Sequence, residues 1–150
     1  MAHTFTNLIA HVIFSTKDRV PCIDAGLKRE LFPYMCTIIS EHGGKVLHVN
    51  GPNDHVHLLI SQPATLATSD MLRLIKANSS KWAREKWPNR SKFGWQTGYG
   101  AFSVSQSNVK EVGRYIASQE EHHKKISFKQ EFIAFLKKHG IEYDERYIWE

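Results

Sequence analysis

Apolar and polar positions in the first part of the chain predict one strand, one helix and a hairpin. Apolar side chains dominate residues 5–15, which indicates a β-strand, and helical spacing over residues 25–42 predicts an amphipathic helix. The turn-forming tetrapeptide Asn50-Gly51-Pro52-Asn53 then separates two short apolar runs, residues 46–49 and 55–60. Such a layout is typical of two antiparallel strands joined by a tight turn.

The second part of the chain is richer in helical patterns. A helix is predicted from about residue 69 to about residue 86, followed by a strand over residues 99–106. Another helix is predicted over residues 108–124, because Asn108 and Glu111 have the spacing of a capping box. A final helix is predicted over residues 128–138, followed by an aromatic and acidic tail.

The predicted order of elements is strand, helix, strand, strand, helix, strand, and then further helices. That order is typical of a ferredoxin-like α+β fold, an antiparallel sheet with two helices on one face, here with additional C-terminal helices. The 150 residues show no repeat, low-complexity tract or linker, so we expect a single domain over residues 1–150. The fold by itself assigns no function, since RNA binders, metal-ion carriers and nucleases share it.

The composition excludes several classes of protein. Hydrophobic residues make up 41% and charged residues 23% of the chain, which is typical of a folded globular protein. No apolar run approaches the roughly 18 residues that span a bilayer, and the first residues lack the layout of a secretory signal. Cys22 and Cys36 are isolated in sequence, which predicts neither a disulfide framework nor a zinc knuckle. We therefore expect a cytoplasmic protein without membrane association.

The positive charge is concentrated in one segment. The net charge of the chain is +5, yet residues 71–109 carry seven Lys and Arg against a single acidic residue, Glu85. Arg73, Lys76 and Arg84 share one face of the predicted helix and would clamp a DNA backbone. A charge run alone more often marks a solvated helix face. Aromatic side chains are interleaved with these charges, which favours binding to nucleic acid, because rings beside a basic groove stack unpaired bases.

A pair of histidines stands on one side of the second hairpin strand. Because side chains alternate along a strand, His55 and His57 point away from the core-facing Val56, Leu58 and Ile60. Neighbours on one face are roughly 7 Å apart, close enough for both rings to reach one divalent ion. The pair is a weak signal by itself, and a surface histidine pair is the alternative interpretation.

A tyrosine and an amide share one face of the helix predicted over residues 108–124. Tyr115 and Gln119 are four positions apart. Two imidazoles and an amide oxygen, without a thiolate, suit a Mg²⁺ or Mn²⁺ ion that also takes a phosphate oxygen. A tyrosine phenol can attack as the phenolate and form a covalent intermediate. In the alternative interpretation, Tyr115 closes the edge of the core and Gln119 is a solvated amide.

The sequence around the histidine pair resembles a known family. Residues 51–60, Gly-Pro-Asn-Asp-His-Val-His-Leu-Leu-Ile, resemble the His-hydrophobic-His (HUH) strand of the single-tyrosine transposases, the TnpA-like enzymes of small insertion sequences. Residues 11–19 look like the opening strand of that family, and residues 75–82 look like its basic helix. The resemblance spans nearly the whole chain and is most specific in residues 95–105 and 115–123.

The resemblance implies a DNA transposase and a set of site residues. Members of the family cut single-stranded DNA beside a hairpin, keep a 5′-phosphotyrosine and rejoin the strands. They work as homodimers in which the tyrosine helix of one subunit can complete the site of the other. By resemblance, His55, His57 and Gln119 would bind the divalent ion, Mg²⁺ or Mn²⁺, and Tyr115 would be the nucleophile. The residues expected to bind DNA are basic: Lys17, Arg19, Arg73, Lys76, Lys81 and Arg84.

Some alternatives stay open at the level of sequence. His122 and His123 lie beside the expected site, but histidines near a helix end more often meet unpaired carbonyls, so neither is included among the ligands. A replication-initiator or relaxase nuclease would use the same chemistry. So would a domesticated relative that acts on repeated palindromes in its own genome. A non-catalytic ferredoxin-like domain that binds nucleic acid would also explain the basic helix.

Overall fold

The computed structural model describes residues 3–150; Met1 and Ala2, the first residues of the expected domain, lie outside the described part. Four antiparallel strands form one sheet in the order β2-β3-β1-β4. The strands are β1 (Ile9–Ser15), β2 (Lys45–Asn50), β3 (His55–Ser61) and β4 (Gly100–Ser103). The helix α1 (Ala25–Glu41) connects β1 to β2, and α2 (Thr68–Lys86) connects β3 to β4. This order and connectivity are ferredoxin-like and confirm the predicted fold class.

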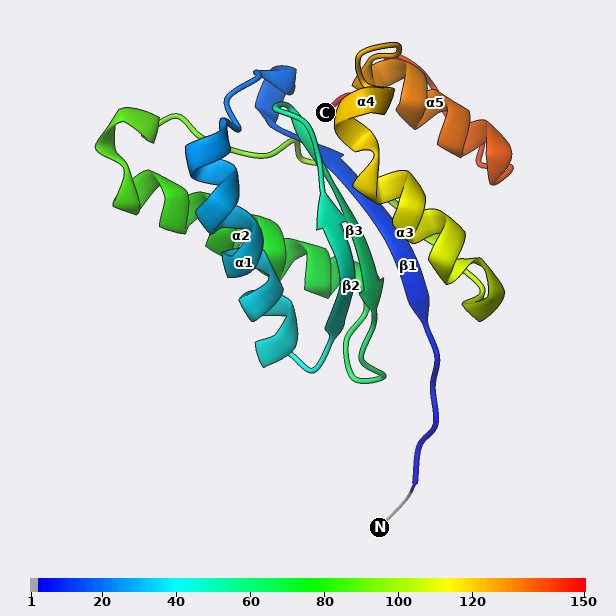
Figure 1. Cartoon of the computed structure of the whole chain (residues 1–150). Coiled ribbons are helices and arrows are strands. Elements are labelled where there is room, and N and C mark those ends of the chain that lie inside the picture. The colour runs from blue at the N-terminus through cyan, green and yellow to red at the C-terminus, as the bar shows by residue number, and fades with distance from the viewer. Residues whose placement is uncertain (1–2) are drawn as a thin grey trace.

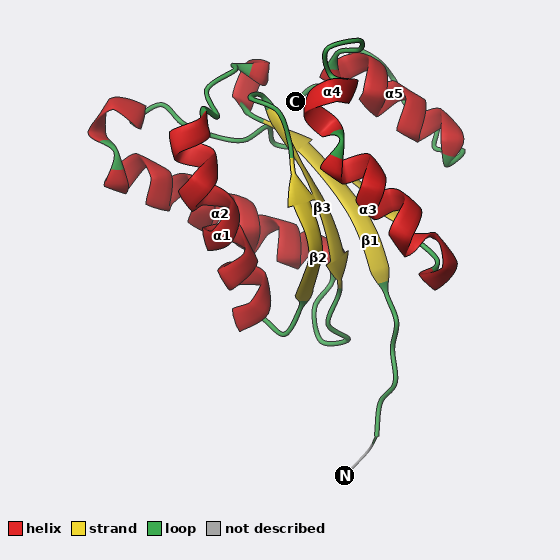
Figure 2. Cartoon of the chain, viewed as in Figure 1, coloured by secondary structure: helices red, strands yellow, loops and turns green. Residues whose placement is uncertain are grey.

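Helices cover both faces of the sheet (Figure 1). α1 and α2 lie against one face, where the core contains Val56, Leu58 and Ile60 of β3. The helices α3 (Val109–Ala117), α4 (Gln119–His122) and α5 (Phe128–Lys138) lie on the opposite side. Figure 2 shows the strands between these two groups of helices. Short 3-10 turns lie in the connections, at Lys17–Arg19, Pro88–Arg90 and Gln106–Asn108.

The second face of the sheet carries apolar clusters of its own. Side chains of the sheet and of α5 pack together there: Ile13, Phe102, Phe128, Phe132 and Leu136. On α3, Ile116 packs with Ile9 and Leu59. Because helices cover this face, His55 and His57 are fully buried. The alternation predicted along β3 is therefore confirmed, and the interpretation of a surface histidine pair is wrong.

Two strands are shorter than the sequence predicts. β1 begins at Ile9 instead of residue 5, because Ile9 pairs with Ser61, the last residue of β3. Phe5, which the pattern placed in the strand, is 92% exposed. β4 ends at Ser103 instead of residue 106, because it pairs only with residues 10–13 of β1 and the chain enters a 3-10 turn at Gln106.

The helix predicted over residues 108–124 is interrupted. α3 ends at Ala117, and Ser118 has φ −96° and ψ 15° before α4 begins at Gln119. The break falls between Tyr115 and Gln119, the two residues expected to share one helix face. The side chain of Asn108 makes no capping bond, so the predicted capping box is wrong at this helix.

The neighbouring helices follow the predicted pattern more closely. A capping box is present at α5, between Ser127 and Gln130. α2 buries Met71 and Ile75, while Trp82 is half-buried at the edge of the core. Within residues 3–150, every helix is too short or too polar to cross a membrane.

Candidate functional site

The turn before β3 fixes the histidine pair. Gly51 lies so close to the strand that a Cβ atom there would be 2.2 Å from the carbonyl oxygen of His55. The Nδ1 atom of His55 lies 2.7 Å from Oδ1 of Asp54, and the Nδ1 atom of His57 lies 2.8 Å from Nε2 of His11 on β1. One nitrogen of each imidazole is thus engaged, which leaves its Nε2 atom for a different partner.

A carboxylate from α5 is the common partner of these Nε2 atoms. The Oε1 atom of Glu131 lies 2.9 Å from Nε2 of His57 and 3.3 Å from Nε2 of His55. It also lies 3.0 Å from Nε2 of His123, the residue that follows α4. One ligand atom from each of these four residues lies within 4.8 Å of the others. The sequence analysis missed Glu131, which has no spacing to β3 that indicates contact. It left His123 out of the ligand set because histidines near a helix end more often meet unpaired carbonyls.

The cluster is buried, and its charges depend on one another. Burial lowers the pKa of His57 to about 4. Burial also opposes the charge on His55, but the carboxylates of Asp54 and Glu131 outweigh it and raise its pKa. Burial by itself would raise the pKa of Glu131, yet hydrogen bonds with His123, His55 and His57 hold that pKa well below its usual range. At neutral pH the site therefore contains an ionised carboxylate among imidazoles.

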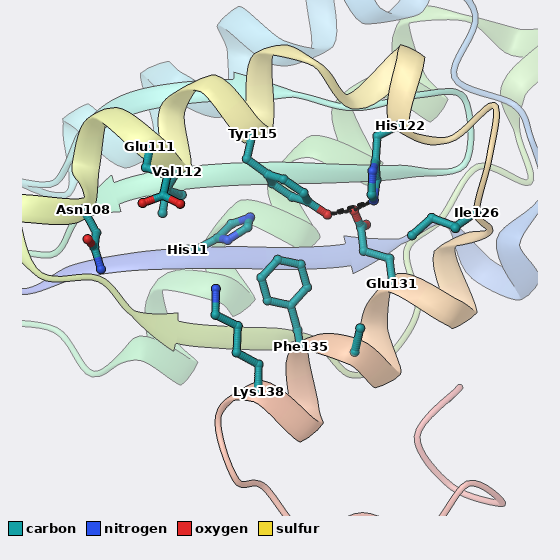
Figure 3. Close-up of a pocket in the computed structure, with 11 residues that line it drawn as sticks. His11, Asn108, Glu111, Val112, Tyr115, His122, Ile126, Glu131, Phe135 and Lys138 are labelled. Atoms are coloured by element: carbon teal, nitrogen blue, oxygen red, sulfur yellow. Dashed lines mark hydrogen bonds and ion pairs between the residues drawn. The ribbon is translucent and has the colours of Figure 1, made fainter.

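Tyr115 points from α3 toward the same carboxylate (Figure 3). Its hydroxyl donates a hydrogen bond to Oε2 of Glu131 and lies 3.1 Å from Nε2 of His122. Burial raises the pKa of Tyr115, and the hydrogen bond and charge of Glu131 raise it further, while the amide of Gln119 lowers it. The phenol is therefore neutral at physiological pH, with Glu131 as its hydrogen-bond acceptor and His122 beside it as a group that can take up its proton.

Gln119 is fully buried beside the tyrosine. Its Nε2 atom lies 3.4 Å from the carbonyl oxygen of Tyr115, and its Oε1 atom has no hydrogen-bond partner among residues 3–150. A buried carbonyl oxygen without a partner is destabilising, which points to a missing ligand. Three imidazoles, a carboxylate and this unpaired amide oxygen are donors that suit a divalent cation. The residues of the site therefore fit a metal ion.

A cavity of about 280 Å³ lies beside the tyrosine. Figure 3 shows His11, Tyr115 and Glu131 around it, with Lys138 of α5 on another side. A lysine ammonium is a point charge that suits a phosphate, and a hydroxyl beside it suits a nucleophile. The cavity can thus place an anionic group next to the phenol.

The basic residues expected to bind DNA are in different environments. Lys17, Arg73 and Lys81 are exposed. Lys76 donates hydrogen bonds of 2.8 Å to the carbonyl oxygens of Thr97 and Gly98, and burial lowers its pKa to about 8. These bonds give Lys76 a structural role that the sequence pattern did not indicate.

Two arginines of the set are also held by backbone carbonyls. Arg84 donates to the carbonyl oxygen of Phe93 at 3.0 Å, and Arg19 donates to that of Trp149 at 3.1 Å. Arg73, in contrast, borders a cavity of about 360 Å³ that Lys76, Trp95 and Tyr99 also line. Trp95 is buried and Tyr99 is half-buried there, so base stacking on these rings stays a prediction.

Comparison with known proteins identifies the family. The family model described as "Transposase IS200 like" matches residues 4–119. The chain is similar to the transposase for insertion sequence element IS200 of Salmonella typhimurium, with 25% identity over 129 residues, 83% of this chain and 84% of the relative. It is also similar to the ISDra2 transposase TnpA of Deinococcus radiodurans, with 25% identity over 116 residues, 74% of this chain and 83% of the relative.

Two solved structures share the fold. A chain from Deinococcus radiodurans, assigned as a transposase, has a TM-score of 0.62 and 21% identity, and the match covers 79% of this chain and 95% of that one. A REP-associated tyrosine transposase bound to a REP hairpin has a TM-score of 0.63 and 12% identity, over 84% of this chain and 74% of that one. Since the family model matches most of the sequence, the chain belongs to the IS200-like transposase family, as the resemblance predicts.

Proposed function

We propose that the protein nicks and rejoins single-stranded DNA, with Tyr115 as the nucleophile and a 5′-phosphotyrosine as the covalent intermediate. The observation that carries this proposal is the position of Glu131, which contacts Tyr115 with one oxygen and three imidazoles with the other. A nucleophile and a set of metal-binding donors thus meet at one point. Metal-assisted cleavage of a phosphodiester through a covalent tyrosine intermediate needs such a combination.

In the proposed reaction the hydroxyl oxygen of Tyr115 attacks the phosphorus of a phosphodiester. The bond from phosphorus to the 3′ oxygen breaks, that oxygen takes up a proton from water, and the 5′ side stays linked to the tyrosine. The phenol proton passes to His122, whose Nε2 atom already lies 3.1 Å from the hydroxyl. Attack by a 3′-hydroxyl on the phosphotyrosine reverses these steps and needs no ATP, because the covalent link retains the energy of the broken bond.

His55, His57 and Gln119 are the residues that we propose to hold a divalent ion, Mg²⁺ or Mn²⁺. When bound, such an ion neutralises charge on the phosphate oxygens. The protein supplies two oriented rings, because Asp54 and His11 engage their Nδ1 atoms. It also supplies the buried amide oxygen of Gln119, which lacks another partner among residues 3–150.

The DNA is proposed to be single-stranded and to contain a hairpin. The solved relative described as a REP-associated tyrosine transposase is bound to a REP hairpin, and its fold resembles that of this chain. Basic side chains attract the phosphate backbone. The aromatic rings interleaved with the basic residues are buried or half-buried, so the proposal rests on the charges and not on stacking with bases. The proposed contacts are Lys17, Arg19, Arg73, Lys76, Lys81 and Arg84.

We also propose a homodimer, on the strength of the resemblance. In this chain, Tyr115 already reaches the imidazole cluster of the same subunit through Glu131. Sedimentation velocity of the purified protein tests the oligomeric state.

Incubation with Mn²⁺ and labelled single-stranded hairpin DNA from the sequences that flank the gene tests the proposed activity. We expect a protein–DNA adduct that survives denaturation, and we expect Tyr115→Phe, His57→Ala or a chelator to abolish it. Tyr147→Phe is the matched control, because Tyr147 is 61% exposed and lies outside the site. This variant should form the adduct as the unchanged protein does.

Two results would contradict the proposal. An adduct that persists in Tyr115→Phe would place the nucleophile elsewhere. Hairpin binding without an adduct under any of these conditions would indicate a non-catalytic nucleic-acid-binding domain.

A further inference from the structure

We propose that His123 and Glu131 are two further ligands of the divalent ion, supplied by the part of the chain that follows the segment matched to the family. The family model ends at residue 119, whereas His123 follows α4 and Glu131 lies in α5. The inference rests on the proposed function, because it enlarges the metal site assigned to His55, His57 and Gln119. It also gives Glu131 a second role, since its other oxygen holds Tyr115.

The contacts around Glu131 carry this inference. Its Oε1 atom is within 3.3 Å of Nε2 of His55, His57 and His123. The Nε2 atoms of His55 and His123 are only 3.1 Å apart. Imidazole nitrogens that converge on one carboxylate oxygen are arranged as ligands of a single cation are. Solvent does not separate them, because the side chain of His123 is 7% exposed and that of Glu131 is 1% exposed.

The partners of Glu131 are of the kind that bind metal ions. Within residues 3–150, all ionic partners of this carboxylate are histidines. Carboxylate oxygens and imidazole nitrogens are both ligands of divalent cations, and one ligand atom from each of His55, His57, His123 and Glu131 lies within 4.8 Å of the others.

The packing of α5 fixes the position of the Glu131 carboxylate. The helix begins with the reciprocal cap of Ser127 and Gln130. Phe128 and Phe132, on either side of Glu131 in the sequence, are both anchored in the apolar cluster beside the sheet. The ring of Phe128 lies 4.9 Å from the ring of His55, measured between centroids. Because its supporting helix is already ordered, Glu131 loses little freedom when an ion binds.

The enlarged donor set changes the expected choice of metal. Mg²⁺ prefers oxygen ligands and retains several waters, whereas imidazole suits transition metals. Three imidazoles, one carboxylate and the amide oxygen of Gln119 therefore favour Mn²⁺ over Mg²⁺. Free Mn²⁺ also gives an electron paramagnetic resonance signal that fades on binding, so the site can be tested without DNA and without turnover.

Titration of Mn²⁺ into the metal-free full chain, followed by the signal of the free ion, tests the inference. We expect Glu131→Gln and His123→Asn each to weaken binding at least about tenfold, since even the loss of a group behind a metal ligand has an effect of that size. Glu121→Gln is the matched control. Glu121 is exposed on α4 and pairs with Lys124 at 3.9 Å, and this substitution removes the same charge outside the cluster. This control should bind Mn²⁺ as the unchanged protein does.

His57→Ala separates this inference from the proposed function. If His57→Ala loses Mn²⁺ while Glu131→Gln and His123→Asn bind normally, the two added ligands are wrong and the proposed metal site stands. If His57→Ala also binds normally, or if the unchanged protein does not bind, the metal site itself is wrong. Tighter binding by Glu131→Gln would mean that the carboxylate excludes the ion, which also overturns the inference.

Circular dichroism and thermal unfolding verify that each variant is folded. Glu131→Asp is the second variant if the glutamine protein does not fold. It keeps the charge but shortens the side chain, so we expect it to weaken Mn²⁺ binding as well. Normal Mn²⁺ binding by a folded Glu131→Asp protein would overturn the assignment of Glu131.

Discussion

His11 of β1 and His57 of β3 are joined by a contact of 2.8 Å between Nε2 of His11 and Nδ1 of His57. The two residues are diagonal neighbours in the sheet, because His57 pairs with Ile13 while His11 pairs with Leu59. An ion held at Nε2 of His57 requires the ring proton on Nδ1, where His11 can accept it. His11 therefore orients the ring of His57 and selects its tautomer.

Replacement of His11 by Leu should weaken Mn²⁺ binding about tenfold to a hundredfold, which is the usual effect of losing a partner behind a metal ligand. His11→Gln keeps a group that can accept the Nδ1 proton, so its affinity should stay within about threefold of the unchanged protein. Calorimetric titration of both variants measures the difference. Equal affinities of the Leu and Gln variants would show that His11 only fills space.

The histidine cluster should give the metal-free protein a maximum of stability near pH 6.5. Burial and the neighbouring His57 lower the pKa of His11 to about 3, and burial lowers that of His57 to about 4. In the unfolded chain both histidines have a pKa of 6.5, so below that pH the unfolded chain binds protons that the folded chain does not. The free energy of unfolding should then fall by up to about 2.7 kcal/mol per pH unit for the two rings.

The raised pKa of His55 makes the free energy of unfolding fall as the pH rises above 6.5. Its stabilising contribution is fully present below pH 6.5 and is lost as the pH rises through its folded pKa. Urea unfolding in the presence of a chelator, from about pH 5 to about pH 8, measures both sides. His11→Gln should roughly halve the slope on the acid side, because one of two neutral rings is gone. A flat acid side would contradict the neutral, buried state of both rings.

The phenol of Tyr115 should ionise more easily when Glu131 loses its charge. Burial raises the pKa of Tyr115, and the hydrogen bond and charge of Glu131 raise it further. In Glu131→Gln the pKa should fall, while burial keeps it above the ordinary value of about 10. The absorbance of tyrosinate during alkaline titration, taken as the difference from Tyr115→Phe, reports this one group. An unchanged difference curve would mean that Glu131 does not act on the phenol.

Arg73→Ala should weaken binding to single-stranded DNA and reduce its salt dependence. Arg73 is exposed and borders the cavity that Trp95 and Tyr99 line. Loss of one phosphate contact lowers the slope of log affinity against log salt by about 0.7 for a single strand. Fluorescence anisotropy at several salt concentrations measures the slope. Lys45→Ala is the control, since Lys45 is exposed at the start of β2, and an equal change in both variants would contradict a specific contact.

The strands could be predicted from local patterns because successive side chains along a strand point to opposite faces of the sheet. Val56, Leu58 and Ile60 alternate with the histidines, and each set lies on its own face of β3. The residues at which the strands end are set instead by pairing between strands. Ile9 starts β1 because its partner Ser61 ends β3, and no local pattern contains that pairing.

The site was predictable only where its residues are close in sequence. His55 and His57 share a strand, and Tyr115 and Gln119 share a short stretch, so spacing alone suggested each pair. Glu131 reaches them because α5 packs its phenylalanines on the sheet, a long-range contact that no period along the chain encodes. The neighbouring histidines His122 and His123 were a sequence signal beside the expected site. The helix break at Ser118, which lies before them in the chain, was not predictable from helical spacing.

The packing of α5 also sets an order in which the centre is built during synthesis. The strands that carry His11 and His57 pair with each other, and both are made long before Glu131. Until α5 packs, the imidazoles lack their shared carboxylate and the phenol lacks its acceptor. The sheet alone therefore carries the histidine pair without the carboxylate that links it to the phenol. If Tyr115 breaks DNA as proposed, that activity depends on the packing of the C-terminal helix as well as on the sheet.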